Sequence, residues 1–121
     1  MKNDQAVEVL AALAQPTRMR AFQTLVNCEP AGVSAGDLAR MLDVPQNTLS
    51  SHLSILSRAG LVTAERQSRS IIYRADLETF QAVALFLLQD CCRGRPEFCA
   101  PLIESLESCC VPAKEAVGSR R

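Results

Sequence analysis

The sequence predicts a single, mostly α-helical domain that carries one β-hairpin. Successive segments place apolar residues at helical spacing, two short β-branched stretches follow them, and a long apolar helix comes last. A chain of 121 residues is a usual length for one domain, and 48% apolar with 21% charged residues is ordinary globular composition. The longest apolar run, residues 82–88, is too short to cross a bilayer, so a membrane span is excluded.

Two helices are predicted at the start of the chain, separated at Pro16. The first is expected to end near Gln15, and the second to open at Pro16 and end before Pro30, because proline breaks or begins helices. The apolar stripes that predict them are Val7, Leu10, Ala11 and Ala14 in the first helix and Met19, Phe22, Leu25 and Val26 in the second.

A pair of short helices joined by a three-residue turn is predicted next. Ser34 is a suitable N-cap with Asp37 three residues later, and residues 43–45 interrupt the helical pattern. The second helix is expected from Gln46 to Ala59, with Gly60 as its stop. The side chains expected to be buried are Leu38, Met41 and Leu42 in the first helix and Leu49, Leu53 and Leu56 in the second.

A β-hairpin and a long helix complete the predicted domain. The strands are expected at residues 61–66 and 71–75, on either side of the polar residues 67–70. From Leu77 to about Cys92, apolar side chains surround most of a helix, which then needs two partners. The second partner is most simply another copy of the chain, so we expect a homodimer through the first and last long helices.

Beyond the long helix, the sequence predicts a separate C-terminal part. Pro101 is expected to open a short helix that ends before Cys109. We therefore divide the chain into a domain formed by the helices and the hairpin, residues 1–92, and a cysteine-rich segment with its tail, residues 93–121.

A helix-turn-helix that runs into a basic hairpin suits the major groove of B-DNA. The start of its second helix carries amide and hydroxyl side chains, which can pair with base edges or phosphates. Arginines on the hairpin can contact phosphates or the minor groove. The DNA-binding residues expected are Gln46, Asn47, Thr48, Ser50, Ser51 and His52 on the helix and Arg66 and Arg69 on the hairpin, with Gln46, Asn47, Ser50 and Ser51 as base readers. Arg74, Arg18 and Arg20 are further candidates for phosphate contacts. The alternative is that these polar side chains only form a solvated surface.

Several stretches resemble the ArsR/SmtB family of winged-helix repressors, over about Leu10 to Ala75. They are LAALAQPTRMRAFQTL, DLARMLDVPQNTLSSHLSILSRAGLV and ERQSRSIIYRA, of which Ser-x-His-Leu at Ser50–Leu53 followed by AGLV at Ala59–Val62 is the most specific. The resemblance implies a winged helix-turn-helix homodimer that represses by binding a pseudo-palindromic operator in double-stranded DNA. It also implies a soft metal or metalloid as inducer.

Five of the six cysteines lie in the last third of the chain. The stretch SAGDLARML, where many members of the family carry metal-binding cysteines, has no Cys or His. The pattern DCCRGRPEFC instead resembles the C-terminal arsenite sites of some members, which implies Cys91, Cys92 and Cys99 as thiolate ligands of As(III) or Sb(III). Cys109 and Cys110 form an alternative trio with Cys99, and the lone Cys28 is expected to be structural.

Other functions remain open or are disfavoured by the sequence. A redox-sensing repressor would join Cys91 or Cys92 to Cys99 in a disulfide, and a zinc- or cadmium-responsive repressor would share the DNA-binding half. A thiol enzyme is not expected, because the sequence has no Cys-x-x-Cys and only one His. The N-terminus lacks the features of a secretory signal, so a cytoplasmic protein is expected.

The net charge of zero does not argue against a DNA partner. The whole chain has 13 Lys plus Arg and 13 Asp plus Glu. Residues 16–75, however, hold seven Arg against four acidic residues. The predicted DNA-binding part is therefore basic, and the remainder carries the compensating negative charge.

Overall fold

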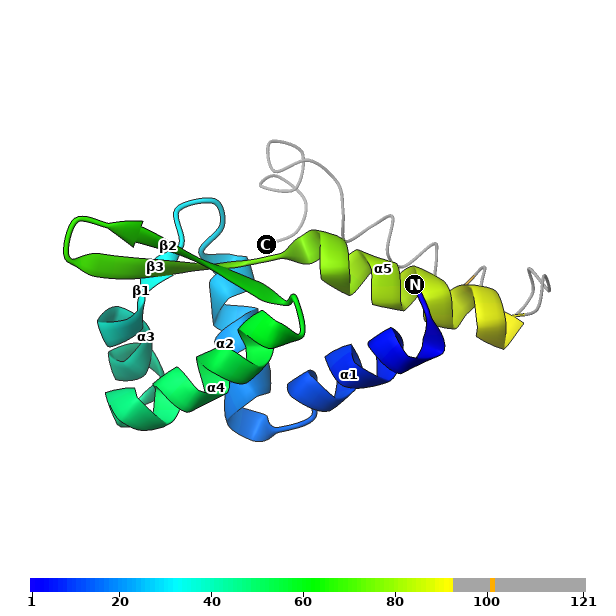
Figure 1. Ribbon diagram of the computed structural model, residues 1–121, viewed down its shortest axis with the longest axis horizontal. Helices are drawn as coiled ribbons and strands as arrows, with labels where there is room; N and C mark the ends of the chain where they lie inside the picture. The colour runs from blue at the N-terminus through cyan, green and yellow to red at the C-terminus, as the bar shows by residue number, and fades with distance from the viewer. Residues whose placement is uncertain (93–100, 102–121) are drawn as a thin grey trace. The chain divides into compact units, whose positions relative to one another are not determined.

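The computed structural model describes residues 1–92 and 101, with the side chains of residues 90–92 excepted. In these residues, five helices and three strands form the winged helix-turn-helix that the sequence predicts, with one strand more than expected (Figure 1). In chain order the elements are α1 (Asn3–Leu13), α2 (Pro16–Asn27), β1 (Val33–Ser34), α3 (Ala35–Leu42), α4 (Gln46–Arg58), β2 (Val62–Gln67), β3 (Ser70–Ala75) and α5 (Leu77–Cys92).

The boundary between α1 and α2 depends on Gln15 and Pro16. Gln15 has extended backbone, and its side-chain oxygen accepts a 2.8 Å hydrogen bond from the backbone N–H of Arg18, so it acts as the N-cap of α2. Pro16 takes the first helical position, where a missing N–H costs nothing. The first helix therefore ends at Leu13, slightly before the predicted end near Gln15.

The helix-turn-helix forms as predicted. Ser34 caps α3 through a 3.2 Å hydrogen bond that its hydroxyl accepts from the N–H of Asp37. Asp43 adopts the left-handed conformation, with φ 58°, and this ends α3. Pro45 precedes α4, which ends at Arg58, and Gly60 with φ 85° turns the chain into β2.

The wing is an antiparallel hairpin of β2 and β3. Its register runs from Val62 opposite Ala75 to Gln67 opposite Ser70, so only two residues form the turn instead of the four polar residues predicted. The short strand β1 was not predicted, and it pairs with β3 to give the sheet order β1-β3-β2. This pairing attaches the wing to the start of α3.

The core is built around the leucines of α4. Leu49, Leu53 and Leu56 are fully buried, as predicted. They belong to one hydrophobic cluster to which every helix from α1 to α5 contributes. Burial of such side chains stabilises the fold by about 1.5–3 kcal/mol each. The half-buried Cys28 packs against this cluster, in keeping with a structural role.

One prediction of a buried side chain is wrong, and α1 packs on a different side from the apolar stripe that predicts this helix. Met41 is 54% exposed, and Ala39 on the same helix is buried in its place. In α1, Val7 and Leu10 are 58% and 39% exposed, because the helix turns its other apolar side to the core. The residues of α1 that pack inward are Ala6, Val9, Ala12 and Leu13.

The chain divides into two compact units, Met1–Phe86 and Leu87–Arg121, so the division falls within α5. The domain boundary between residues 92 and 93 stays a prediction. The short helix expected from Pro101 lies outside the described residues, apart from Pro101 itself. Among the helices that the structure describes, none has the length and apolar character needed to span a bilayer.

Candidate nucleic-acid interface

Helix α4 has one buried and one exposed side. Its leucines recur at i, i+4 and i+7 and fix which side faces the core. The opposite side is formed by small polar residues, all exposed, so the predicted base readers lie together on the molecular surface. These polar residues are Gln46, Asn47, Thr48, Ser50 and Ser51, and all of them except Thr48 are predicted base readers.

The hydrogen-bonding groups at the start of α4 are available to a ligand. Asn47 Oδ1 accepts a 2.9 Å hydrogen bond from the N–H of Thr48, which leaves the side-chain amide NH₂ free to donate. Gln46, Ser50 and Ser51 make no side-chain hydrogen bond to another described residue. Base edges are read by such unpaired donors and acceptors, and hydroxyls of this kind also contact phosphates.

His52 differs from its polar neighbours. It is half-buried, and its Nδ1 lies 3.3 Å from Nη1 of Arg18. Because a guanidinium only donates, Nδ1 accepts, and this leaves Nε2 as the N–H of the ring. His52 therefore has a structural partner in α2, and its predicted DNA contact would have to be made by Nε2.

The two arginines of α2 hold helix ends. Arg18 Nε donates to the carbonyl of Ala12 at 2.6 Å, and Arg20 Nη2 donates to the carbonyl of Leu42 at 3.0 Å. Ala12 and Leu42 lie in the last turns of α1 and α3, where carbonyls lack helical partners. These contacts give Arg18 and Arg20 structural roles that the sequence alone did not indicate.

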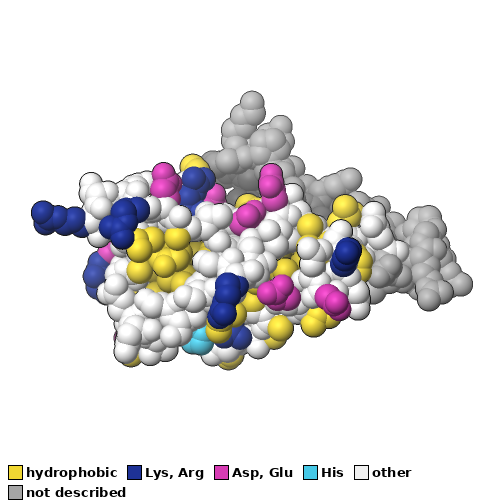
Figure 2. All heavy atoms as spheres, in the orientation of Figure 1, with side chains coloured by type: hydrophobic (Ala, Val, Ile, Leu, Met, Phe, Trp, Pro, Cys, Tyr) yellow, Lys and Arg dark blue, Asp and Glu magenta, His cyan; other side chains and the backbone are white. Residues whose placement is uncertain are grey.

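The wing carries exposed positive charge. Arg66 on β2 and Arg69 in the turn are both exposed, as phosphate or minor-groove contacts require. Figure 2, which shows one side of the molecule, has Lys and Arg side chains projecting around the end where the hairpin lies. Arg74 is less available, because its Nη2 lies 3.4 Å from Glu29 Oε1 in an ion pair.

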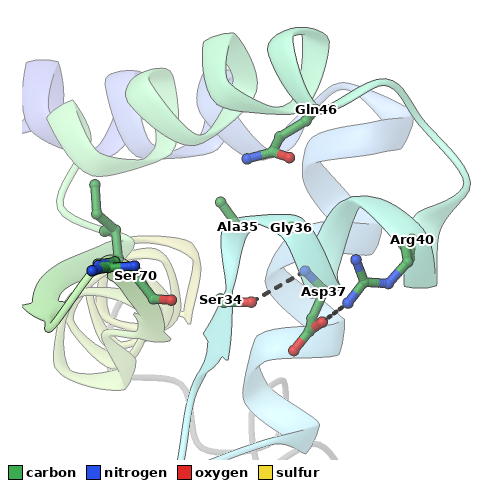
Figure 3. A pocket seen from close by; sticks show the side chains of 9 residues that line it. Ser34, Ala35, Gly36, Asp37, Arg40, Gln46 and Ser70 are labelled. Carbon is green, nitrogen blue, oxygen red and sulfur yellow. Dashed lines mark hydrogen bonds and ion pairs between the residues drawn. The ribbon is translucent and has the colours of Figure 1, made fainter.

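A cleft of about 350 Å³ separates the wing from the helix-turn-helix (Figure 3). Gln46 of α4, Ser70 of the wing and the first turn of α3 line it, together with Arg69. Arg40 also lines it and forms an ion pair with Asp37. The sequence did not suggest that Arg40 lines a cleft. Its position three residues after Asp37 on a predicted helix does, however, indicate an ion pair between the two side chains. The cleft brings Gln46 and Arg69 to one opening.

The predicted inducer site lies outside the described side chains. Cys99, Cys109 and Cys110 lie outside the described residues, and for Cys91 and Cys92 only the backbone is described, in the last turn of α5. Among the side chains that are described, no group of three or more His, Cys, Asp or Glu could hold a metal ion.

Comparisons with known proteins identify the family. Residues 13–65 match a helix-turn-helix domain family. The chain is 32% identical over 87 residues to the HTH-type transcriptional regulator YbzH of Bacillus subtilis, which covers 72% of this chain and 87% of that protein. It is 41% identical over 71 residues to the HTH-type transcriptional repressor SmtB of Mycobacterium tuberculosis, covering 59% of this chain and half of that protein. The chain belongs to the ArsR/SmtB family of winged-helix transcriptional regulators.

Solved structures agree with this assignment. An ArsR-like transcriptional regulator from Rhodococcus sp. RHA1 superposes on the ArsR/SmtB-family chain with a TM-score of 0.68, at 29% identity, covering 80% of this chain and 89% of that one. A homodimeric winged helix-turn-helix DNA-binding domain, Mb0332 from Mycobacterium bovis, gives a TM-score of 0.59 at 26% identity, covering 69% and 75%. The regulator thus belongs to a family of DNA-binding transcriptional regulators.

Proposed function

We propose that this ArsR/SmtB-family regulator is a cytoplasmic repressor that binds a pseudo-palindromic operator as a homodimer. In the same proposal, trivalent arsenic or antimony, bound by cysteine thiolates, releases it from the DNA. The observation that carries the DNA-binding half is the cluster of exposed polar side chains on α4, held in place by three fully buried leucines. A rigid helix with this surface is what major-groove readout requires.

The recognition surface is proposed to divide into readers and anchors. Gln46, Asn47, Ser50 and Ser51 read base edges, because amides and hydroxyls can pair with them. Arg66 and Arg69 on the wing contact phosphates or enter the minor groove, which adds affinity and positions the protein without reading sequence. The cleft between Gln46 and the wing is open, so both parts can meet the same duplex.

Exposed apolar side chains support the homodimer. In the unit Met1–Phe86, α1 exposes Val7 and Leu10 while α5 exposes Phe80 and Leu85, the last by 57%. Apolar side chains so placed favour burial against a partner. The homodimeric Mycobacterium bovis domain has a similar fold, and we propose the same assembly for this chain. A two-fold dimer also matches a pseudo-palindromic operator.

The inducer site is proposed on the donor chemistry of the cysteines. Helix α5 runs to Cys92, so the vicinal pair Cys91 and Cys92 ends the helix, and Cys99 follows a few residues later in the sequence. Three thiolates are the ligands that a soft trivalent metalloid prefers. Cys109 and Cys110 remain the alternative partners of Cys99. Because thiols must lose their protons to bind, inducer affinity should rise with pH.

Fluorescence anisotropy with a duplex selected from a random library tests this proposal. Arsenite, antimonite, zinc, cadmium and peroxide are titrated separately into the complex under reducing conditions, peroxide after removal of the reductant. We expect release by arsenite and antimonite, and retention of the DNA by Cys99→Ser. Cys28→Ser is the matched control and should respond as the unmodified protein does, while Cys91→Ser and Cys109→Ser separate the two trios.

The alternative functions predict different results in the same experiment. If peroxide alone releases the DNA, the regulator is a redox sensor. If zinc dissociates the complex while arsenite and antimonite leave it unchanged, the metalloid proposal is wrong.

A further inference from the structure

Arg18 joins three helices through a single side chain. Its Nε donates a 2.6 Å hydrogen bond to the carbonyl of Ala12 in α1, and its Nη1 lies 3.3 Å from Nδ1 of His52 in α4. Its backbone N–H is held by Gln15, the N-cap of α2. The guanidinium therefore connects the end of α1 to the middle of α4.

Local chemistry explains why an arginine stands here. In a continuing helix the carbonyl of Ala12 would accept from the N–H of residue 16, but that residue is Pro16 and has none. Arg18 supplies the missing donor. The planar guanidinium offers several N–H groups in fixed directions, so it can hold His52 at the same time. A lysine could not reproduce this geometry, since its ammonium is a single point charge on a flexible stem.

The contact borders an open cleft between α1 and α4. A cleft of about 310 Å³, lined by Ala11 of α1 and Ile55 of α4, opens beside Arg18. At the edge of this cleft, the side chain of Arg18 supplies a polar link between the two helices in addition to their shared core. His52 directly follows Ser51, one of the proposed base readers, so a change at the bridge reaches the recognition surface.

We propose that Arg18 is a positioning residue that sets the angle between α1 and α4. This inference rests on the proposed function, because α1 carries the proposed dimer surface with Val7 and Leu10, and α4 the recognition surface. In a dimer, that angle fixes the separation of the two recognition helices. Two half-sites of an operator lie about 34–36 Å apart, so a small rotation misplaces the second helix once the first has docked.

The test compares two duplexes by fluorescence anisotropy. One is the full operator selected from a random library by the unmodified protein, and the other is the same duplex with one half-site scrambled. We expect Arg18→Gln to bind the full operator about tenfold more weakly and the single half-site within about twofold of the unmodified protein. Arg18→Lys should behave like Arg18→Gln. Arg58→Gln removes an exposed arginine that lines the same cleft and should leave both affinities unchanged.

Two further measurements separate positioning from direct DNA contact. A residue that binds a phosphate contributes about one unit to the slope of log affinity against log salt, whereas a positioning residue leaves the slope unchanged. His52→Gln removes the other end of the bridge without touching α2. We expect its losses on the full operator to be non-additive with those of Arg18→Gln, as for residues in one network. If thermal unfolding shows that Arg18→Gln does not fold, the two duplexes are compared with His52→Gln instead.

Several results would overturn the inference. Equal losses on both duplexes, rescue by Arg18→Lys, or a lower salt slope for Arg18→Gln would make Arg18 a phosphate contact or a general stabiliser. Unchanged binding to the full operator would also overturn it. If the unmodified protein selects no duplex at all, the proposed function itself fails, and this outcome is distinct from every result with the Arg18 variants.

Discussion

Arg20 Nη2 donates a 3.0 Å hydrogen bond to the carbonyl of Leu42, the last residue of α3. Arg20 belongs to α2, so this bond attaches the turn of the helix-turn-helix to the helix behind it. The next residue, Asp43, has the left-handed conformation that redirects the chain toward α4. The direction of the recognition helix thus depends partly on a side chain 22 residues earlier in the sequence.

Arg20→Met is expected to lower the free energy of unfolding by about 1 kcal/mol, because it removes one charge-assisted hydrogen bond to a helix end. Urea denaturation followed by circular dichroism measures the change. Arg69→Met, in the exposed wing turn, is the matched control and should leave the unfolding free energy within about 0.5 kcal/mol of the unmodified protein. Equal losses for the two variants would contradict a specific role for Arg20.

Two glycines give opposite predictions for substitution by alanine. Gly32 has φ 81°, and a Cβ there would lie 2.7 Å from Ile72 Cγ2 and 2.8 Å from the carbonyl of Tyr73. Gly32→Ala is therefore expected to cost about 2–5 kcal/mol through backbone strain and overpacking against β3. At Gly36, in α3, a Cβ would meet nothing closer than 3.7 Å. Gly36→Ala should be neutral or stabilise the protein by up to about 1 kcal/mol.

Thermal unfolding of both variants checks this prediction. The midpoint of Gly32→Ala should fall by roughly 10 °C or more, and that of Gly36→Ala should not fall. Similar midpoints for the two variants would contradict the close approach of Gly32 to β3.

The exposed side of α1 makes a prediction about assembly. Leu10→Asp, with or without Val7→Asp, should convert a dimer into a monomer, because a charge at a buried apolar contact costs several kcal/mol. Sedimentation equilibrium should then change from twice 13.2 kDa to 13.2 kDa. Met41→Asp replaces an equally exposed apolar residue on α3 and should leave the mass unchanged. A dimer that survives both substitutions in α1 would place the interface elsewhere.

The wing arginines are expected to add affinity without adding specificity. Arg66→Gln and Arg69→Gln should each weaken binding to all duplexes alike and lower the salt slope by about one unit. Anisotropy at several salt concentrations, with a selected and a scrambled duplex, measures both effects. A loss confined to the selected duplex would instead make the wing a sequence reader.

Local patterns in the sequence were enough to predict most of the fold. The cap at Ser34, the leucine spacing of α4 and the break at Pro16 act over a few residues, so they can be read directly from the chain. Periodicity could not decide which apolar side of α1 faces the core, because the helix has two. The choice of Ala39 over Met41 likewise depends on the shape of the packed neighbours.

The candidate site was predicted in part for the same reason. The exposed polar residues of α4 follow from the positions of its leucines, which are local. The bridge from Arg18 to His52 joins residues 34 positions apart, and the ion pair of Arg74 with Glu29 joins residues 45 apart. Such contacts depend on tertiary packing, and no motif in a single sequence indicates them.

The exposed hydroxyls of α4 offer the most direct test of the central claim, that this helix reads DNA sequence. The measurement is the ratio of affinities for the selected and a scrambled duplex, for the unmodified protein and for Ser50→Ala with Ser51→Ala. We predict that the double variant keeps its thermal stability and its affinity for the scrambled duplex, while the ratio falls about tenfold or more. An unchanged ratio in a folded double variant would contradict the account.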